Sequence, residues 1–216
     1  MKLLRQIGAV SIGMGAMLAI NAQAQNLLSD PDFASGAFVA NGSGGWTGFG
    51  NSSFSTAYTY GPTTYSMELS GPGGYTVPGT YQYVAATPGA SYLLTGYAYV
   101  PIALADTSDQ GFLQLTFDSS SYANLGTVQT SPGNALASTP VITSTSPTGE
   151  WIYTSEIATA PADTAYAEPF TLVLDADAPT TVYFDDLSLT EVPEPTALCL
   201  AGLGLVGMLG LRRRKV

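Results

Sequence analysis

The segment between residues 25 and 191 alternates apolar and polar side chains over short stretches, and this period of two constrains the fold most. Within residues 112–117, Leu113, Leu115 and Phe117 alternate with Gln114 and Thr116, which places the apolar side chains on one face of a strand. No stretch keeps a 3.6-residue period for three helical turns, and proline or glycine interrupts the chain about every ten residues. The pattern predicts a body made of short β-strands.

Turn signals divide this body into eight or nine expected strands. We place them at residues 26–28, 54–60, 65–69, 80–85, 92–100, 112–117, 151–157, 170–174 and 182–189. Residues 41–45 and 131–149 are expected loops, and Trp46 and Trp151 are expected in the core. So many short strands predict an all-β fold, a two-sheet β-sandwich of the jelly-roll type.

The charges of the chain are divided between its body and its ends. All six basic residues lie outside residues 25–191, which contain no Lys, Arg or His but hold fifteen of the sixteen carboxylates, Glu194 being the other. Nucleic-acid binding is excluded, because neutralising phosphates needs Lys or Arg. The one cysteine, Cys199, lies near the C-terminus, so the body has no disulfide. At about 165 residues the body is expected to be one domain, residues 25–190.

The first 24 residues have the organisation of a secretory signal peptide. Lys2 and Arg5 precede an apolar stretch from residue 7 to 20, and Ala22-Gln23-Ala24 offers the small-residue cleavage site. The secretion translocon and signal peptidase are therefore expected partners.

The last residues have the organisation of a membrane stop signal. An uncharged apolar run at 197–211 follows Val192-Pro193-Glu194-Pro195 and precedes Arg212, Arg213, Arg214 and Lys215. As a transmembrane helix the run is about 22 Å long, and the cations hold the C-terminus on the cytoplasmic side. An ordinary membrane anchor is the alternative to a processing signal.

Residues 191–216, with their Val192-Pro193-Glu194-Pro195 motif, apolar helix and basic tail, resemble the PEP-CTERM sorting signal of exopolysaccharide-producing Gram-negative bacteria. The resemblance implies an exosortase, a membrane protease, as a partner. It also implies export, transient anchoring in the inner membrane, and a final location at the cell surface or in the extracellular matrix.

Three stretches of the body resemble carbohydrate-binding-module-like jelly rolls. They are residues 26–36 with Trp46, the Pro88-Gly89-Ala90-Ser91-Tyr92 stretch, and residues 182–189. The resemblance suggests a structural Ca²⁺ that joins the first and last strands through Asp30, Asp32, Asp185 and Asp186. The family's acidic residue after the first aromatic is Ala34 here, and the alternative is that Asp185 and Asp186 accept hydrogen bonds from a neighbouring loop.

The body offers little catalytic chemistry, because it lacks the His, Lys, Cys and Arg that most mechanisms use. Carboxylate pairs remain, namely Asp106 with Asp109, Asp175 with Asp177, and Asp185 with Asp186, and each is expected to cap a turn or stay solvated. We therefore expect no catalytic residues and no required cofactor. Sugars bind by stacking on exposed aromatic rings, and the candidates for this are Tyr58, Tyr60, Tyr81 and Tyr83.

Together these features predict a secreted or surface-displayed, non-catalytic protein of the exopolysaccharide matrix, processed by an exosortase and able to bind extracellular polysaccharide weakly. Two alternatives stay open. The first is a carboxylate-dependent polysaccharide hydrolase, and the second is an envelope adhesin that binds protein.

Overall fold

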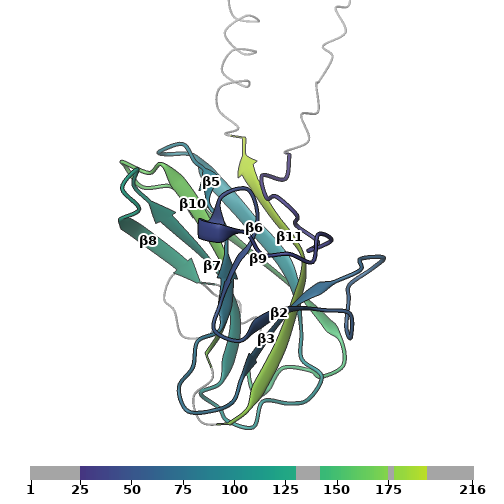
Figure 1. Ribbon diagram of the computed structural model, residues 1–216. Helices are drawn as coiled ribbons and strands as arrows, with labels where there is room; N and C mark the ends of the chain where they lie inside the picture. The colour runs from purple at the N-terminus through teal and green to yellow at the C-terminus, as the bar shows by residue number, and fades with distance from the viewer. Residues whose placement is uncertain (1–24, 130–141, 175–177, 194–216) are drawn as a thin grey trace, which may run out of the picture.

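The computed structural model describes residues 25–129, 142–174 and 178–193, and within these ranges the fold is a two-sheet β-sandwich (Figure 1). A single 3-10 turn, η1 (Ala40–Gly42), accompanies the strands. The strands are β1 (Thr47–Phe49), β2 (Ser52–Ser55), β3 (Ser66–Gly71), β4 (Gly79–Tyr81), β5 (Val84–Ala85), β6 (Ser91–Tyr99), β7 (Gln110–Asp118), β8 (Asn124–Gln129), β9 (Trp151–Thr159), β10 (Tyr166–Leu174) and β11 (Thr180–Val192). The predicted all-β sandwich is confirmed.

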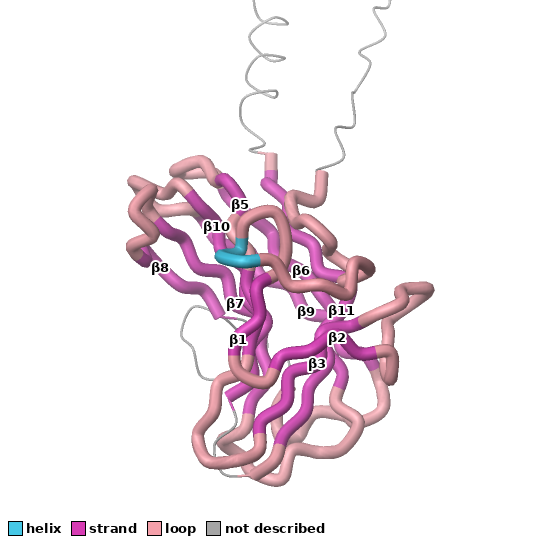
Figure 2. The backbone as a smooth tube through the Cα atoms, in the orientation of Figure 1, coloured by secondary structure: helices cyan, strands magenta, loops and turns pink. Residues whose placement is uncertain are grey.

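The two sheets are antiparallel and mix strands from distant parts of the chain (Figure 2). The six-stranded sheet has the order β1-β4-β10-β7-β8, with β5 paired to β10 as well. The five-stranded sheet has the order β2-β3-β11-β6-β9. Because β10 and β11 lie in different sheets, the chain passes from one layer to the other between Leu174 and Thr180.

The core lies between the sheets and follows the alternation expected from the sequence. On β7, Leu113, Leu115 and Phe117 are buried against the other sheet, while Gln114 faces outward and is half-buried. Gly96 on β6 faces inward, and a Cβ there would collide with the Leu187 side chain of β11. The Leu187 side chain of the neighbouring strand therefore occupies the space that an alanine at position 96 would need.

Trp46 is buried as predicted, and it fixes the start of the domain. Its indole Nε1–H donates to the Asp30 carbonyl at 2.8 Å, and its ring lies 5.2 Å from that of Phe33. Residues 26–28 lie along β11, because Leu27 N–H donates to the Leu189 carbonyl at 2.8 Å. They do not form the strand that we predicted, because the Asn26 side chain donates to the Leu187 carbonyl and accepts from the Leu189 N–H.

Four other expectations need correction. The strand expected at 54–60 ends at Ser55, and the one expected at 80–85 is interrupted because the Gln82 amide binds the Ser29 backbone at 2.9 and 3.1 Å. Strands β1 and β8 were not predicted. Trp151 is not in the core, because it lies on the outward face of β9 with its ring 5.2 Å from that of Tyr99.

The two ends of the sandwich lie side by side at one pole (Figure 1). One small hollow at this pole is bordered by residues of both ends, namely Gln25, Leu27, Glu191 and Pro193. The predicted signal peptide and the predicted transmembrane helix at 197–211 fall outside the described residues, and within these no helix is long and apolar enough to cross a membrane.

Candidate functional site on an outward tyrosine face

Aromatic side chains gather on the outward face of the six-stranded sheet. In the antiparallel register Tyr81 of β4 lies opposite Phe170 of β10, and their rings are 5.5 Å apart. The Tyr83 ring contacts Tyr81, Tyr122 and Tyr166 at centroid distances of 5.5, 4.9 and 5.8 Å. We call this set the tyrosine face, and its members are Phe49, Tyr81, Tyr83, Tyr122, Tyr166 and Phe170.

The tyrosine face contains a hollow of about 410 Å³, which is lined by Asn41, Tyr81, Tyr83 and Tyr122. Tyr122, in the turn between β7 and β8, is 56% exposed and stacks on Tyr166 with an interplanar angle of 3°. The η1 turn lies against these rings: Gly42 has a φ of 64°, and a Cβ at this position would lie 2.8 Å from the Tyr81 ring. The Gly42 carbonyl also accepts the Tyr83 N–H at 2.8 Å.

Two carboxyl groups lie beside these rings on the same sheet. Asp118 ends β7 opposite Tyr166, and Glu168 of β10 lies opposite Thr116, so both side chains belong to the outward face. They are nevertheless only 3% and 7% exposed. Burial, followed by the hydrogen bond and the charge of Asp118, raises the pKa of Glu168 to about 8, although a hydrogen bond from Tyr83 opposes this.

With its pKa raised to about 8, Glu168 keeps its proton at neutral pH and donates it to Asp118, since two buried carboxylates in contact cannot both ionise without cost. Burial and the neighbouring Glu168 also raise the pKa of the Tyr83 hydroxyl. The Asp118 Oδ2 atom is buried without a hydrogen-bond partner. Sequence reasoning missed this pair, because only the pairing of β10 with β7 brings the two residues together.

The four tyrosines expected to stack on sugars divide between the two sheets. Tyr81 and Tyr83 belong to the tyrosine face, whereas Tyr58 and Tyr60 lie on the outward face of the five-stranded sheet. There Tyr60 stacks on Tyr97 with centroids 3.6 Å apart, and Tyr58 stacks on Tyr99 at 4.6 Å. One side of each of these two rings is thus covered by the protein itself.

The four aspartates expected to hold a cation have other contacts in the structure. Asp185 is buried and accepts hydrogen bonds at 2.8 Å from Tyr60 N–H, Thr63 Oγ1 and Asp186 N–H. Its burial raises its pKa to about 6, against the effect of these donors. Asp186 is exposed at a bulge with a φ of 48°.

The remaining two aspartates bind their own turn: Asp30 accepts from Ser35 N–H and Oγ, and Asp32 from Ala34 N–H. Over residues 25–129, 142–174 and 178–193 no group of three or more acidic, cysteine or histidine side chains comes together. Because the Asp30 and Asp185 carboxylates already accept N–H and O–H hydrogen bonds and the four side chains do not come together, the residues do not fit the expected Ca²⁺ site.

Of the carboxylate pairs expected from spacing, Asp106 and Asp109 have different surroundings. Asp106 is held by Ser108 in an exposed turn, while Asp109 is fully buried and accepts the Thr180 hydroxyl at 2.9 Å. Asp175 and Asp177 lie outside the described residues.

Residues 191–215 match the PEP-CTERM protein-sorting motif. The chain carries a PEP-CTERM sorting signal. The signal implies export, membrane-anchored sorting in a Gram-negative bacterium and processing by an exosortase. No curated protein matches the sequence.

Three solved structures share the fold of the body at low sequence identity. The CBM22-1 xylan-binding domain of Paenibacillus barcinonensis Xyn10C has a TM-score of 0.50 and 14% identity over 79% of this chain and 97% of its own. Tailspike protein 4 of bacteriophage CBA120 has a TM-score of 0.54 and 13% identity over 77% of this chain. The CBM22-1-GH10 modules of Clostridium thermocellum Xyn10B have a TM-score of 0.50 and 16% identity over 78%.

The chain spans only 21% of the tailspike structure and 29% of the Xyn10B structure. The shared part is the jelly-roll sandwich of carbohydrate-binding modules, as the resemblance of the body implied.

Proposed function

We propose that the processed protein is a non-catalytic component of the exopolysaccharide matrix that binds neutral polysaccharide on its tyrosine face. The observation that carries this proposal is the hollow between Tyr81, Tyr83 and Tyr122. Its walls are aromatic rings that offer CH–π stacking surfaces to pyranose rings, and the Asn41 amide supplies a donor and an acceptor for sugar hydroxyls. The hollow is already formed without a ligand, which limits the entropy lost on binding.

The charge of the body favours a neutral polysaccharide over an acidic one. Residues 25–191 contain no Lys, Arg or His, so uronate or sulfate groups find no cationic partner. The Asp118–Glu168 pair adds a negative charge close to the rings. An acidic chain is therefore repelled, and we expect its binding to be weaker at low ionic strength, where screening is least.

The Asp118–Glu168 pair does not favour the alternative of a hydrolase. Glycosidases place their two carboxyl groups about 5–9.5 Å apart to hold a water or a sugar carbon between them. Here the two groups are in hydrogen-bond contact and buried. We expect no new reducing ends when the protein is incubated with the polysaccharide that it binds. A steady release of reducing ends would instead support the hydrolase alternative.

Affinity electrophoresis in gels that contain soluble neutral polysaccharides (xylan, galactomannan and hydroxyethyl cellulose) tests the proposal. Tyr122→Asn should weaken retardation about two- to tenfold, since one ring contact is worth about 0.5–1.5 kcal/mol. Tyr75→Asn is the matched control, because Tyr75 is 75% exposed, does not line the hollow and also has a positive φ, 66° against 59° for Tyr122. Asparagine tolerates this backbone conformation.

If the gels retard Tyr122→Asn as strongly as the wild type, the binding site lies elsewhere on the protein. Retardation by none of these gels, together with binding to envelope proteins, would favour the adhesin.

The sorting signal is tested at its Pro-Glu-Pro segment. Each proline biases the preceding residue towards an extended backbone, the form that a protease cleft accepts. Replacing Pro193, Glu194 and Pro195 with alanines should make a longer, membrane-bound form accumulate with its basic tail intact. A plain anchor needs the apolar run and the cations but not the prolines, so equal release of both forms into the medium would show that the motif is only a linker.

A further inference from the structure

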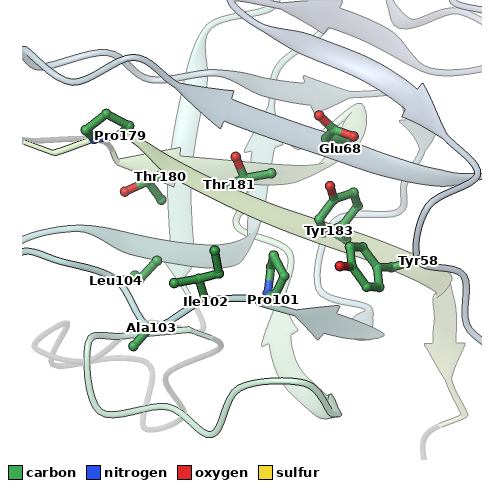
Figure 3. Close-up of a pocket in the computed structure, with 10 residues that line it drawn as sticks. All are labelled: Tyr58, Glu68, Pro101, Ile102, Ala103, Leu104, Pro179, Thr180, Thr181 and Tyr183. Carbon is green, nitrogen blue, oxygen red and sulfur yellow. The ribbon is translucent and has the colours of Figure 1, made fainter.

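A second hollow, of about 390 Å³, is bordered by residues of β3, β11 and the loop after β6 (Figure 3). Tyr58 and Tyr183 lie side by side at one end of it, and Pro101 and Ile102 from the loop after β6 approach them. Glu68 of β3 and Thr181 of β11 supply polar atoms. Because Met67, Leu69, Val182 and Phe184 point into the core, Glu68 and Tyr183 face outward from the five-stranded sheet.

The aromatic end of this hollow is fixed by the segment between β2 and β3. Tyr58 stacks on Tyr99 at 4.6 Å and meets Tyr183 in an edge contact at 5.0 Å, and it is 38% exposed, so part of the side chain remains accessible to a ligand. The Tyr58 carbonyl accepts the Ser66 hydroxyl at 2.6 Å, and the nearby Tyr60 N–H is held by the Asp185 carboxylate. The ring is thus positioned before any ligand arrives.

The polar groups of the hollow suit hydroxyl-rich, uncharged ligands. Burial, followed by the charge and the hydrogen bond of Glu68, raises the pKa of Tyr183 to about 12. Tyr183 therefore donates to Glu68, whose other lone pairs can accept ligand hydroxyls, and the Thr181 hydroxyl can both donate and accept. An anionic ligand would meet the Glu68 carboxylate without a balancing cation, since the body contains none.

We infer that this hollow is a second sugar-binding site and that the protein bridges two polysaccharide chains. The inference rests on the proposed function at the tyrosine face. The two sites face away from each other on opposite sheets, so one straight chain cannot contact both, and a second chain is needed to fill the second site. Bridging chains in this way is a structural role in a matrix that needs no catalysis.

The test uses a short, uniform oligosaccharide from the polysaccharide that retards the wild type most, with the stoichiometry measured by calorimetry. We expect two sites per protein for the wild type, of which Tyr122→Asn weakens one about two- to tenfold. Ile102→Arg should leave only the site on the tyrosine face, because Ile102 is 77% exposed, so the longer side chain can cover the hollow without loss of core packing. Ile157→Arg is the matched control, since Ile157 is 59% exposed on the same sheet but does not line the hollow.

Bridging itself is measured as capture of a fluorescent soluble chain on beads coated with the same polysaccharide. Both Tyr122→Asn and Ile102→Arg should reduce capture at least about twofold, whereas Ile157→Arg should retain it. A single site in the wild type, weakened by Tyr122→Asn, would overturn the inference and leave the proposed function intact. No oligosaccharide binding by the wild type would overturn both.

Discussion

Replacing Glu168 with glutamine should change how the stability of the protein depends on pH. Glu168 has a pKa raised from its ordinary value of 4.5 to about 8, so the folded state holds a proton there that the unfolded chain loses. Stability from this group is fully present below pH 4.5 and is lost as the pH rises to about 8. One pKa unit corresponds to about 1.36 kcal/mol, so the difference between 4.5 and 8 sets an upper limit of about 5 kcal/mol.

We expect a loss on the order of 2–5 kcal/mol, because relaxation and water penetration reduce the cost of a buried charge. The Glu168→Gln amide can still donate to Asp118 and accept from Tyr83, but it has no proton to lose. The variant should therefore match the wild type near pH 5 and exceed it in free energy of unfolding at pH 9.

Urea unfolding at pH 5, 7 and 9, followed by tryptophan fluorescence, measures this difference. Glu150→Gln in the exposed turn before β9 is the control, because it removes a carboxylate without touching the pair. Asp185 has a pKa raised to about 6. In all variants it therefore adds a pH dependence to the free energy of unfolding, and this dependence ends near pH 7. A wild type and a Glu168→Gln variant with parallel pH profiles between pH 5 and 9 would refute the proton-sharing pair.

Three further predictions concern packing, cations and proteolysis. Gly96→Ala should lower the free energy of unfolding by about 1–3 kcal/mol, because its Cβ meets Leu187, and an unchanged urea midpoint would contradict this packing. The melting temperature should be the same in EDTA and in millimolar Ca²⁺, because donors already occupy the carboxylates of Asp30 and Asp185; a rise of several degrees with Ca²⁺ would establish the cation site. Protein purified from culture medium should resist trypsin entirely, since residues 25–191 contain no Lys or Arg, and a shortened band would reveal a retained end.

The sequence predicted the parts of the fold that depend on local pattern. Strands such as β7 were found because Leu113, Leu115 and Phe117 keep a strict period of two. The three-residue β1 was missed, since it contains Gly48 and is too short to show a period. The second half of the stretch expected at 54–60 carries tyrosines that favour strands, but Asp185 holds this segment across the face of the sheet instead.

The candidate site was only partly accessible to sequence reasoning. Tyr81 and Tyr83 were found because aromatic residues crowd that part of the chain. Tyr122 and Tyr166 were missed, because isolated tyrosines far from this cluster carry no local signal. Only the pairing of β10 with β7 and β4 brings these rings to one face.

The adjacency of the two ends of the sandwich makes the body a transplantable unit. A domain whose first and last residues meet can be inserted into another protein, or rejoined by a short linker and opened elsewhere, with its strand pairing retained. A circular permutant that links Pro193 to Gln25 and begins at the exposed Gly61 turn keeps every strand intact. The sorting signal and the β-sandwich body are thus separable, and either can be exchanged while the other is retained.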